Sequence, residues 1–298
     1  MQLGLIGLGR MGRIVGDRVS SAGHDVLAFD RDAAARDRVD FETVSSLADL
    51  CDELSTPRRL WLMVPAGEPV DAVLKELANS LNSEDVVVDA GNSNYRASID
   101  RAAAIDAGFL DCGTSGGPAG AETGFSLMVG GPAWAYEAMT PVFDAVATGP
   151  AGHHRMGPSG AGHYVKMIHN GIEYAIMGAY GEGFELLANG RYDLDLEAIA
   201  RTWNNGSVIR SWLLELCEEA FEQEGNELGD VADYVAGGST GSWTVQEAIE
   251  QEVPVPLIYT ALAERFDSRT DERFARRLTN HLRHGFGHHP IVRRDEVE

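Results

Sequence analysis

Lysine is nearly absent from this chain of 298 residues: only Lys75 and Lys166 are lysines, and every other basic side chain is arginine. Acidic residues outnumber basic ones by 46 to 24, which gives a formal net charge of -22. So negative a surface would repel a phosphate backbone, which argues against nucleic acid as a partner. It suits a protein kept dissolved in concentrated salt, where screening shortens the range of self-repulsion. We therefore expect a halophilic source with a salt-rich cytoplasm.

Cysteine is scarce, and long apolar runs are absent. Cys51, Cys112 and Cys217 are odd in number and form no CxxC or Cys/His pattern, so we expect reduced, buried thiols and no disulfide framework or metal site. No apolar stretch reaches the roughly 18 residues of a membrane helix, and no basic segment precedes one. These absences predict a soluble cytoplasmic protein with no membrane partner. The length and the 44% hydrophobic content favour two domains.

The first 30 residues have the pattern of a nucleotide-binding unit. An apolar run at 2–6 precedes Gly7-Leu8-Gly9-Arg10-Met11-Gly12, a helical segment reaches about residue 22, and a second apolar run ends at Asp30. In such a unit the first glycine forms the turn, the second admits a pyrophosphate and the third lets the helix pack on the strand. The phosphates bind the helix N-terminus. We predict a dinucleotide site here; the alternative is a merely glycine-rich turn.

The residue that ends the second strand bears on the choice of cofactor. Asp30 can accept hydrogen bonds from ribose hydroxyls but would repel a 2′-phosphate, which favours NAD over NADP. Arg31 follows it and could stack on adenine or bind a 2′-phosphate, so the sequence leaves NADP open.

The first half of the chain alternates between strand and helix. Runs at 60–64, 86–89, 109–112 and 126–129 read as strands, separated by helical segments such as 69–78 and 98–107. Alternation of this kind predicts an α/β fold of the Rossmann type, with a parallel, doubly wound sheet. Ligands bind beyond the carboxyl ends of such strands. We therefore expect three turns to converge: Val64-Pro65-Ala66-Gly67, Asp89-Ala90-Gly91-Asn92-Ser93 and Ser115-Gly116-Gly117.

The second half has no strand pattern. Residues 147–159 are rich in Gly, Pro and His and are predicted to form a hinge. It would separate a dinucleotide-binding Rossmann domain, 1–157, from an all-helical domain for substrate binding and dimerisation, 158–298. Helical periodicity predicts the following segments in that domain: 160–188, 195–203, 208–222, 243–251, 256–268 and 271–284.

The first of these helices carries a dense group of polar residues. At about 100° per residue, one face holds Lys166, His169, Asn170, Glu173 and Tyr174. Lysine can lose its proton when buried or placed near other cations, whereas arginine cannot. One of only two lysines in the chain is thus a candidate general base. The alternative interpretation is a solvated helix face with a charge pair seven residues apart.

With these motifs in view, the chain closely resembles the decarboxylating 6-phosphogluconate dehydrogenases, in their short form, within the wider β-hydroxyacid dehydrogenase family. The resemblance covers nearly the whole chain. It rests on the glycine turn 7–12, the turns 89–93 and 115–117, the segment 166–174, Ser239-Thr240-Gly241-Ser242-Trp243-Thr244, and Arg283-His284-Gly285-Phe286-Gly287-His288-His289.

The resemblance implies a reaction and two catalytic residues. The reaction is oxidative decarboxylation of 6-phosphogluconate to ribulose 5-phosphate and CO2 with reduction of NAD or NADP, a step of the pentose phosphate pathway. Lys166 would take the proton of the substrate 3-hydroxyl while hydride leaves C3, its neutral form being favoured near a cationic nicotinamide. Glu173 would protonate C1 of the enediol. Two proton-transfer groups are needed because O3 and C1 are different positions.

The resemblance also implies binding residues and a partner. Tyr174 and Arg265 would hold the terminal phosphate, while Arg283 and His289 would enter the neighbouring subunit's site, as expected for a homodimer or larger homo-oligomer. The implied substrate-binding set is Asn92, Ser115, Gly116, Gly117, His169, Asn170, Tyr174, Arg265, Arg283 and His289. The implied cofactor-binding set is Gly7, Leu8, Gly9, Arg10, Met11, Gly12, Asp30, Arg31, Val64, Pro65, Ala66 and Asn92.

One departure and two alternatives remain. Longer relatives carry lysines in the stretch that is 238–243 here, whereas this chain has none, so Thr240 and Ser242 are candidates to replace part of the phosphate grip. One alternative is a non-decarboxylating β-hydroxyacid dehydrogenase, such as one acting on 3-hydroxyisobutyrate. The other is a non-catalytic NAD-binding sensor or imine-reductase-like scaffold, in which Lys166 is not a base.

Overall fold

The computed structural model describes residues 1–270, 273–288, 290–291 and 293. It divides into two compact units, Met1–Asn170 and Gly171–Glu298. The division falls inside one long helix, α8 (Ala161–Ala188).

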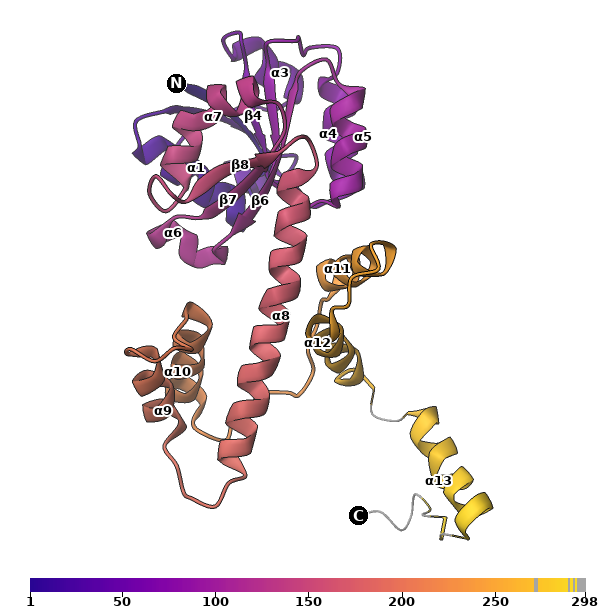
Figure 1. The fold of residues 1–298 in the computed structure, drawn as a ribbon. Coiled ribbons are helices and arrows are strands. Elements are labelled where there is room, and N and C mark those ends of the chain that lie inside the picture. Colours follow the sequence, from indigo (N-terminus) through magenta and orange to yellow (C-terminus); the bar gives the residue numbers. More distant parts are fainter. Residues whose placement is uncertain (271–272, 289, 292, 294–298) are drawn as a thin grey trace. The chain divides into compact units, whose positions relative to one another are not determined.

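The first unit is built on one eight-stranded sheet, in the order β3-β2-β1-β4-β5-β6-β7-β8 (Figure 1). Its strands are β1 (Gln2–Ile6), β2 (Asp25–Phe29), β3 (Glu42–Thr43), β4 (Arg59–Leu62), β5 (Val86–Asp89), β6 (Gly108–Ser115), β7 (Ser126–Gly130) and β8 (His153–Gly157). The chain moves from β1 to β2 on one side and later to β4 on the other. This reversal of strand order opens a crevice for ligands beyond the carboxyl ends of β1 and β4.

Helices cover both faces of this sheet. One face packs against α1 (Arg10–Ser21) and α7 (Ala133–Val146), and the other against α3 (Leu47–Glu53), α4 (Glu68–Leu77) and α5 (Tyr95–Ala104). In β5, Val86 and Val88 lie in the first core and Val87 in the second, because side chains alternate along a strand. The predicted doubly wound α/β arrangement is confirmed. The remaining short helices are α2 (Ala33–Arg36), η1 (Gly117–Ala119) and α6 (Gly120–Thr123).

The predicted parallel pairing is confirmed for every pair of neighbouring strands except β6 and β7. β7 runs antiparallel to β6, with Ser126 opposite Ser115. The connection between them is short: it comprises residues 116–125 and contains η1 and α6. A parallel crossover needs about a dozen or more residues, so this short connection returns the chain in the opposite direction.

The segment predicted to be a hinge contains a strand instead. β8 lies within 147–159 and pairs in parallel with β7, Leu127 opposite His153. Its glycine and proline content is typical of a linker, but pairing with β7 decides the local structure. The compact units part between Asn170 and Gly171, and the domain boundary at 157/158 stays a prediction.

The second unit is helical throughout its described part. Besides the C-terminal part of α8 it contains α9 (Leu196–Asn204), α10 (Trp212–Glu224), α11 (Ser239–Glu250), α12 (Pro256–Asp267) and α13 (Phe274–Gly287). Side chains of Asp195 and Ser211 accept backbone hydrogen bonds at the starts of α9 and α10, which are ordinary N-caps. Within the described ranges, no helix is both long and apolar enough to span a membrane.

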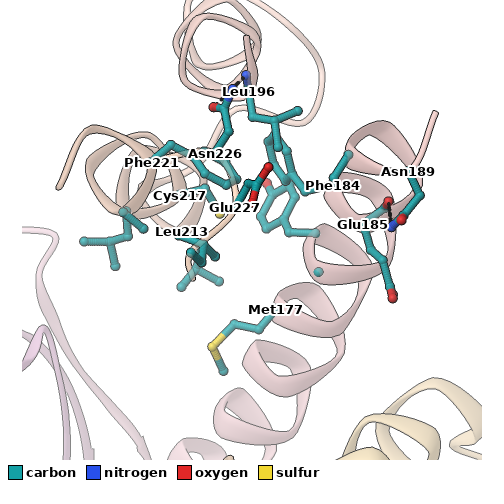
Figure 2. Close-up of a pocket in the computed structure, with 16 residues that line it drawn as sticks. Met177, Phe184, Glu185, Asn189, Leu196, Leu213, Cys217, Phe221, Asn226 and Glu227 are labelled. Carbon is teal, nitrogen blue, oxygen red and sulfur yellow. Dashed lines mark hydrogen bonds between the residues drawn. The ribbon is translucent and has the colours of Figure 1, made fainter. Parts of the chain in front are cut away.

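An aromatic core joins α8, α9 and α10. Phe184 and Phe221 lie with ring centroids 5.0 Å apart, and Leu196 and Leu214 are buried beside them. Phe184, Leu196 and Phe221 border an apolar cavity of about 500 Å³ (Figure 2). At its edge, Asn226 hydrogen bonds to the backbone of Leu194, before α9, and of Leu196, at its start. Of the residues predicted to bind substrate, none that the structure describes lines this cavity.

Candidate active site

The glycine turn before α1 has the geometry that a bound pyrophosphate requires. Gly7 has a φ of 99°, a left-handed conformation that side chains disfavour. A Cβ at Gly9 would meet no atom within 4 Å, and no side chain caps the helix there. A Cβ at Gly12 would collide with the Gly7 carbonyl. The turn therefore leaves open space at a helix N-terminus, where backbone N–H groups attract anions.

Asp30, directly after β2, holds this turn in place. Its Oδ2 accepts a hydrogen bond of 2.6 Å from the backbone N–H of Leu8, and its Oδ1 accepts one of 2.9 Å from Asp32. A carboxylate has about four acceptor positions, so further bonds to ribose hydroxyls remain feasible.

A cavity of about 600 Å³ adjoins the turn, within the usual size range of cofactor sites. Of the predicted cofactor residues, it is lined by Gly7, Leu8, Gly9, Arg10, Asp30, Arg31, Val64 and Pro65. Met11, Gly12, Ala66 and Asn92 do not line it. Arg13 and Arg38 also line this cavity, although they were not predicted as cofactor residues. The sequence offered a signal for Arg13: it follows Arg10 by three positions, so the two arginines lie on one face at the start of α1.

Lys166 is placed by close packing of α8 on β6. Lys166 is 7% exposed. A Cβ at Gly113 of β6 would overlap the Lys166 side chain, and a Cβ at Gly162 would overlap the Asp111 and Met128 carbonyls. Only glycine at these two positions permits the approach. Gly113 was not predicted as a site residue, because nothing in the local pattern relates it to Lys166.

Asp111, on strand β6, holds the start of α8 by hydrogen bonds. This fully buried carboxylate of β6 accepts hydrogen bonds of 2.6 Å from Gly160 N–H and 2.8 Å from His163 N–H. On the same helix, His163 Nδ1 lies 2.8 Å from Ser98 Oγ. Asp111 was missed, although an acidic residue inside an apolar strand is a sequence signal for a buried structural carboxylate.

Four of the predicted residues lie together around His169. Its Nδ1 is 3.3 Å from Lys166 Nζ and 3.1 Å from Asn170 Oδ1. Its Nε2 is 3.4 Å from Ser115 Oγ. An amine, an imidazole, an amide and a hydroxyl at this spacing can exchange a proton with a polyhydroxylated substrate and hydrogen bond to it.

Two turns at the ends of strands bear further predicted residues. After β6, Gly116 and Gly117 have φ values of 134° and 56°. After β5, Asn92 is exposed and left-handed, with a φ of 56° that asparagine tolerates better than most residues. Burial raises the pKa of the Cys112 thiol on β6, which favours its protonated form over the reactive thiolate.

A second group of predicted residues meets within the second unit. The Tyr174 hydroxyl lies 3.3 Å from Thr240 Oγ1, and the Arg265 guanidinium lies 3.6 Å from the centroid of the Tyr174 ring. Ser242 instead donates a hydrogen bond to the Gly238 carbonyl. Cation–π contact with tyrosine orients the planar fork of the arginine. The arrangement brings α8, α11 and α12 to one point.

Three predicted residues remain, of which the structure describes two. Glu173 is half-buried on α8, and Arg283 is exposed on α13. His289 lies outside the described residues.

Two family models match the chain, and together they cover most of it. Residues 2–159 match the NAD binding domain of 6-phosphogluconate dehydrogenase. Residues 162–295 match the 6-phosphogluconate dehydrogenase C-terminal domain.

Similar proteins agree with these matches. The NAD(+)-dependent, decarboxylating 6-phosphogluconate dehydrogenase of Haloferax volcanii is 69% identical over 99% of this chain and 100% of its own. A structure of Plasmodium falciparum 6-phosphogluconate dehydrogenase is 28% identical, with a TM-score of 0.82, over 100% of this chain and 67% of that one. A Salmonella typhimurium 3-hydroxyisobutyrate dehydrogenase structure, 23% identical over 88% of this chain and 92% of its own with a TM-score of 0.69, shares the fold. The chain belongs to the 6-phosphogluconate dehydrogenase family.

Proposed function

We propose that this protein catalyses the oxidative decarboxylation of 6-phosphogluconate to ribulose 5-phosphate and CO2. The family and the full-length likeness to the H. volcanii enzyme support the reaction. The observation that carries the proposal is the buried lysine, Lys166, next to His169 and on the same unit as the cofactor cavity.

Lys166 and Glu173 divide the proton transfers. A dinucleotide held by the glycine turn and Asp30 would supply the acceptor for the hydride that leaves C3 of the substrate. Lys166 takes the proton of the 3-hydroxyl, and the resulting 3-keto acid loses CO2 because the ketone accepts the electron pair. The protonated lysine then stabilises the developing enolate oxygen. Glu173 delivers the proton that C1 of the enediol requires.

Asn92, Ser115, Gly116 and Gly117 would hold the substrate near its carboxylate, and His169 and Asn170 would bind its hydroxyls. The contact between Ser115 and His169 supports a shared role for these two positions. The Tyr174, Thr240 and Arg265 group supports a terminal-phosphate site, because guanidinium forks match phosphate oxygens.

NAD is the proposed cofactor, with a preference over NADP. The acceptor oxygens of Asp30 beside the cavity support it, because they favour a ribose hydroxyl over a 2′-phosphate. The glycine turn and the residues lining the cavity would hold the dinucleotide. Arg31 lines the same cavity and could bind a 2′-phosphate. The ratio of kcat/KM with NAD to kcat/KM with NADP measures the preference.

We further propose a homodimer or larger homo-oligomer in which the C-terminal tail completes the neighbouring site. Helix α13 supports it: Phe274, Leu278 and Leu282, spaced by four, are 70%, 44% and 56% exposed. A helix with an uncovered apolar stripe needs a partner surface. Arg283 and His289 would be the residues that the tail delivers.

The acidic, lysine-poor composition supports adaptation to concentrated salt in a halophilic cytoplasm. The H. volcanii relative comes from a halophile. Location in the cytoplasm stays a prediction from the sequence.

The function is tested by absorbance of reduced nicotinamide in concentrated KCl, with 6-phosphogluconate and either NAD or NADP, and with 3-hydroxyisobutyrate as control. We expect reduction with 6-phosphogluconate and one CO2 released per cofactor reduced. Activity on the control acid alone would leave a non-decarboxylating dehydrogenase, and binding of NAD without turnover of either acid would leave a sensor.

A further inference from the structure

Arg101 is a buried cation that no step of the proposed reaction uses. It lies on α5 and is 6% exposed. Its Nη1 donates to Asp89 Oδ2 at 3.0 Å and to Ser93 Oγ at 2.9 Å, and its Nε donates to Asp71 Oδ1 at 2.7 Å. Its Nη2 donates to the Gly67 carbonyl at 3.1 Å. One guanidinium therefore binds four residues from three places in the chain.

These partners frame the turn that carries Asn92. Asp89 is the last residue of β5 and is fully buried. Its Oδ1 accepts from Gly91 N–H at 3.0 Å, and its Oδ2 accepts from Ser93 Oγ at 2.8 Å. The left-handed backbone of Asn92 lies between these two anchors. Arg101 holds the carboxylate and the hydroxyl that fix this conformation.

The fourth partner belongs to the turn that follows β4. Gly67 precedes α4 with a φ of 87°, and Val64 and Pro65 just before it line the dinucleotide cavity. The two turns are also in close approach, since a Cβ at Gly91 would lie 2.5 Å from the Val64 carbonyl oxygen. A displacement of either turn would therefore displace the other.

The same strand offers a comparison at its opposite end. Asp85 precedes β5, is fully buried, and pairs with Arg58 Nη1 at 3.1 Å. Asp85 also accepts from Arg58 N–H at 2.5 Å. β5 thus has an Arg–Asp pair at each end, in which both aspartates are buried, Arg101 is buried and Arg58 is half-buried. Only the Arg101 pair lies at the carboxyl end of the strand, where ligands bind in doubly wound sheets.

We propose that Arg101 is a positioning residue that locks the turn 64–67 and the turn 89–93 into one rigid support. This support sets the nicotinamide half of the cofactor relative to C3 of the substrate. The inference rests on the proposed function for the roles of the two turns. Arg101 itself contacts neither ligand; it acts through Asn92 and through the backbone of Val64 and Pro65.

The test compares Arg101→Gln with Arg58→Gln, which removes a half-buried arginine paired with a buried aspartate at the other end of β5. Binding of NAD and of ADP-ribose is measured by calorimetry, kinetic constants are measured with 6-phosphogluconate, and the folded fraction is measured by thermal unfolding. ADP-ribose contains the adenosine and pyrophosphate of NAD but no nicotinamide. A difference between the two ligands therefore reports how the nicotinamide is placed, beyond the binding of adenosine and pyrophosphate in the cavity.

For Arg101→Gln we expect kcat to fall roughly 10- to 100-fold, because misplacement by about an ångström has effects of that size. NAD binding should weaken while ADP-ribose binding stays within about twofold of wild type. Arg58→Gln should leave all of these constants within about twofold once corrected for unfolded protein. Arg101→Lys should restore part of kcat, because an ammonium can pair with Asp89 but lacks the fork that also reaches Gly67.

Equal losses of kcat in Arg101→Gln and Arg58→Gln, or equal weakening of NAD and ADP-ribose, would overturn the proposal. If Arg101→Gln does not fold, Ser93→Ala decides: the same split between NAD and ADP-ribose supports positioning, and unchanged constants refute it. If wild-type protein does not turn over 6-phosphogluconate, the proposed function fails. The comparison of NAD with ADP-ribose would still decide the role of Arg101.

Discussion

At the scale of single residues, Lys166 stands out because it is one of two lysines in the chain and because it is buried. Lys75, the other lysine, is exposed on α4, whereas Lys166 is buried against β6. A chain that replaces nearly all lysines by arginine has kept one where only a side chain that can release its proton would serve as a base.

Lys166→Met should lower kcat with 6-phosphogluconate by roughly 10²- to 10⁴-fold, the usual worth of a general base. Lys75→Met is the control for loss of a lysine, and it should leave kcat unchanged. Steady-state kinetics in concentrated KCl measure both. NAD binding should survive in both variants, because Lys166 is absent from the residues that line the cofactor cavity. Full activity of Lys166→Met would contradict its role as a base.

Arg265→Met should raise KM for 6-phosphogluconate by roughly 10- to 100-fold, as expected for loss of a charged hydrogen bond worth about 1.5–3 kcal/mol. Gluconate, which lacks the phosphate, should show no such change in KM. Arg276→Met is a control, because Arg276 pairs with Asp267 on the protein itself. An equal effect on both substrates would mean that Arg265 supports the fold around Tyr174.

At the scale of elements, the junction of β6 and α8 places the base. Gly113 and Gly162 permit close packing, and Asp111 ties the helix start to the strand. A carboxylate at a helix N-terminus also interacts favourably with the helix dipole.

Asp111→Asn should destabilise the protein by about 1–3 kcal/mol, because the amide supplies one acceptor oxygen where the buried carboxylate supplies two. Asp195→Asn provides the comparison: it caps α9 through one bond to Ala198 N–H, and asparagine caps about equally well. Chemical unfolding in concentrated KCl measures both changes. Equal stability of the two variants would show that the second bond of Asp111 contributes little.

At the scale of the whole molecule, the net charge of -22 governs stability. Like charges on a compact surface repel one another, and salt shortens that repulsion from a Debye length of about 10 Å at 0.1 M to about 3 Å at 1 M. We expect Tm to rise on the order of 10 °C between 0.1 M and 3 M KCl. Calorimetric scans across KCl concentrations measure it. An unchanged Tm would argue against adaptation to salt.

The stripe on α13 gives the prediction for assembly. Leu278→Asp should weaken the oligomer and make activity depend on protein concentration, because it places a charge in a surface proposed to be buried between subunits. Thr279→Asp makes the same change in charge at the next, exposed position and should leave assembly intact. Sedimentation velocity distinguishes them. If both variants remain oligomeric and active, another surface joins the subunits.

The sequence by itself determined the features that depend on neighbouring residues. The glycine turn, Asp30 at a strand end, the helix face from Lys166 to Tyr174 and the alternation of strand and helix are local patterns, and local backbone geometry enforces them. The succession of an α/β unit by a helical one was predictable for the same reason.

The tertiary structure alone decided which distant residues meet. β8 forms because β7 offers it a partner, and β7 reverses because its connection is short. Asp111 caps a helix some 50 positions away, and Arg101 reaches back 34 positions to Gly67. No periodicity encodes such pairings, since a buried charge takes whichever partner the fold brings within hydrogen-bonding distance.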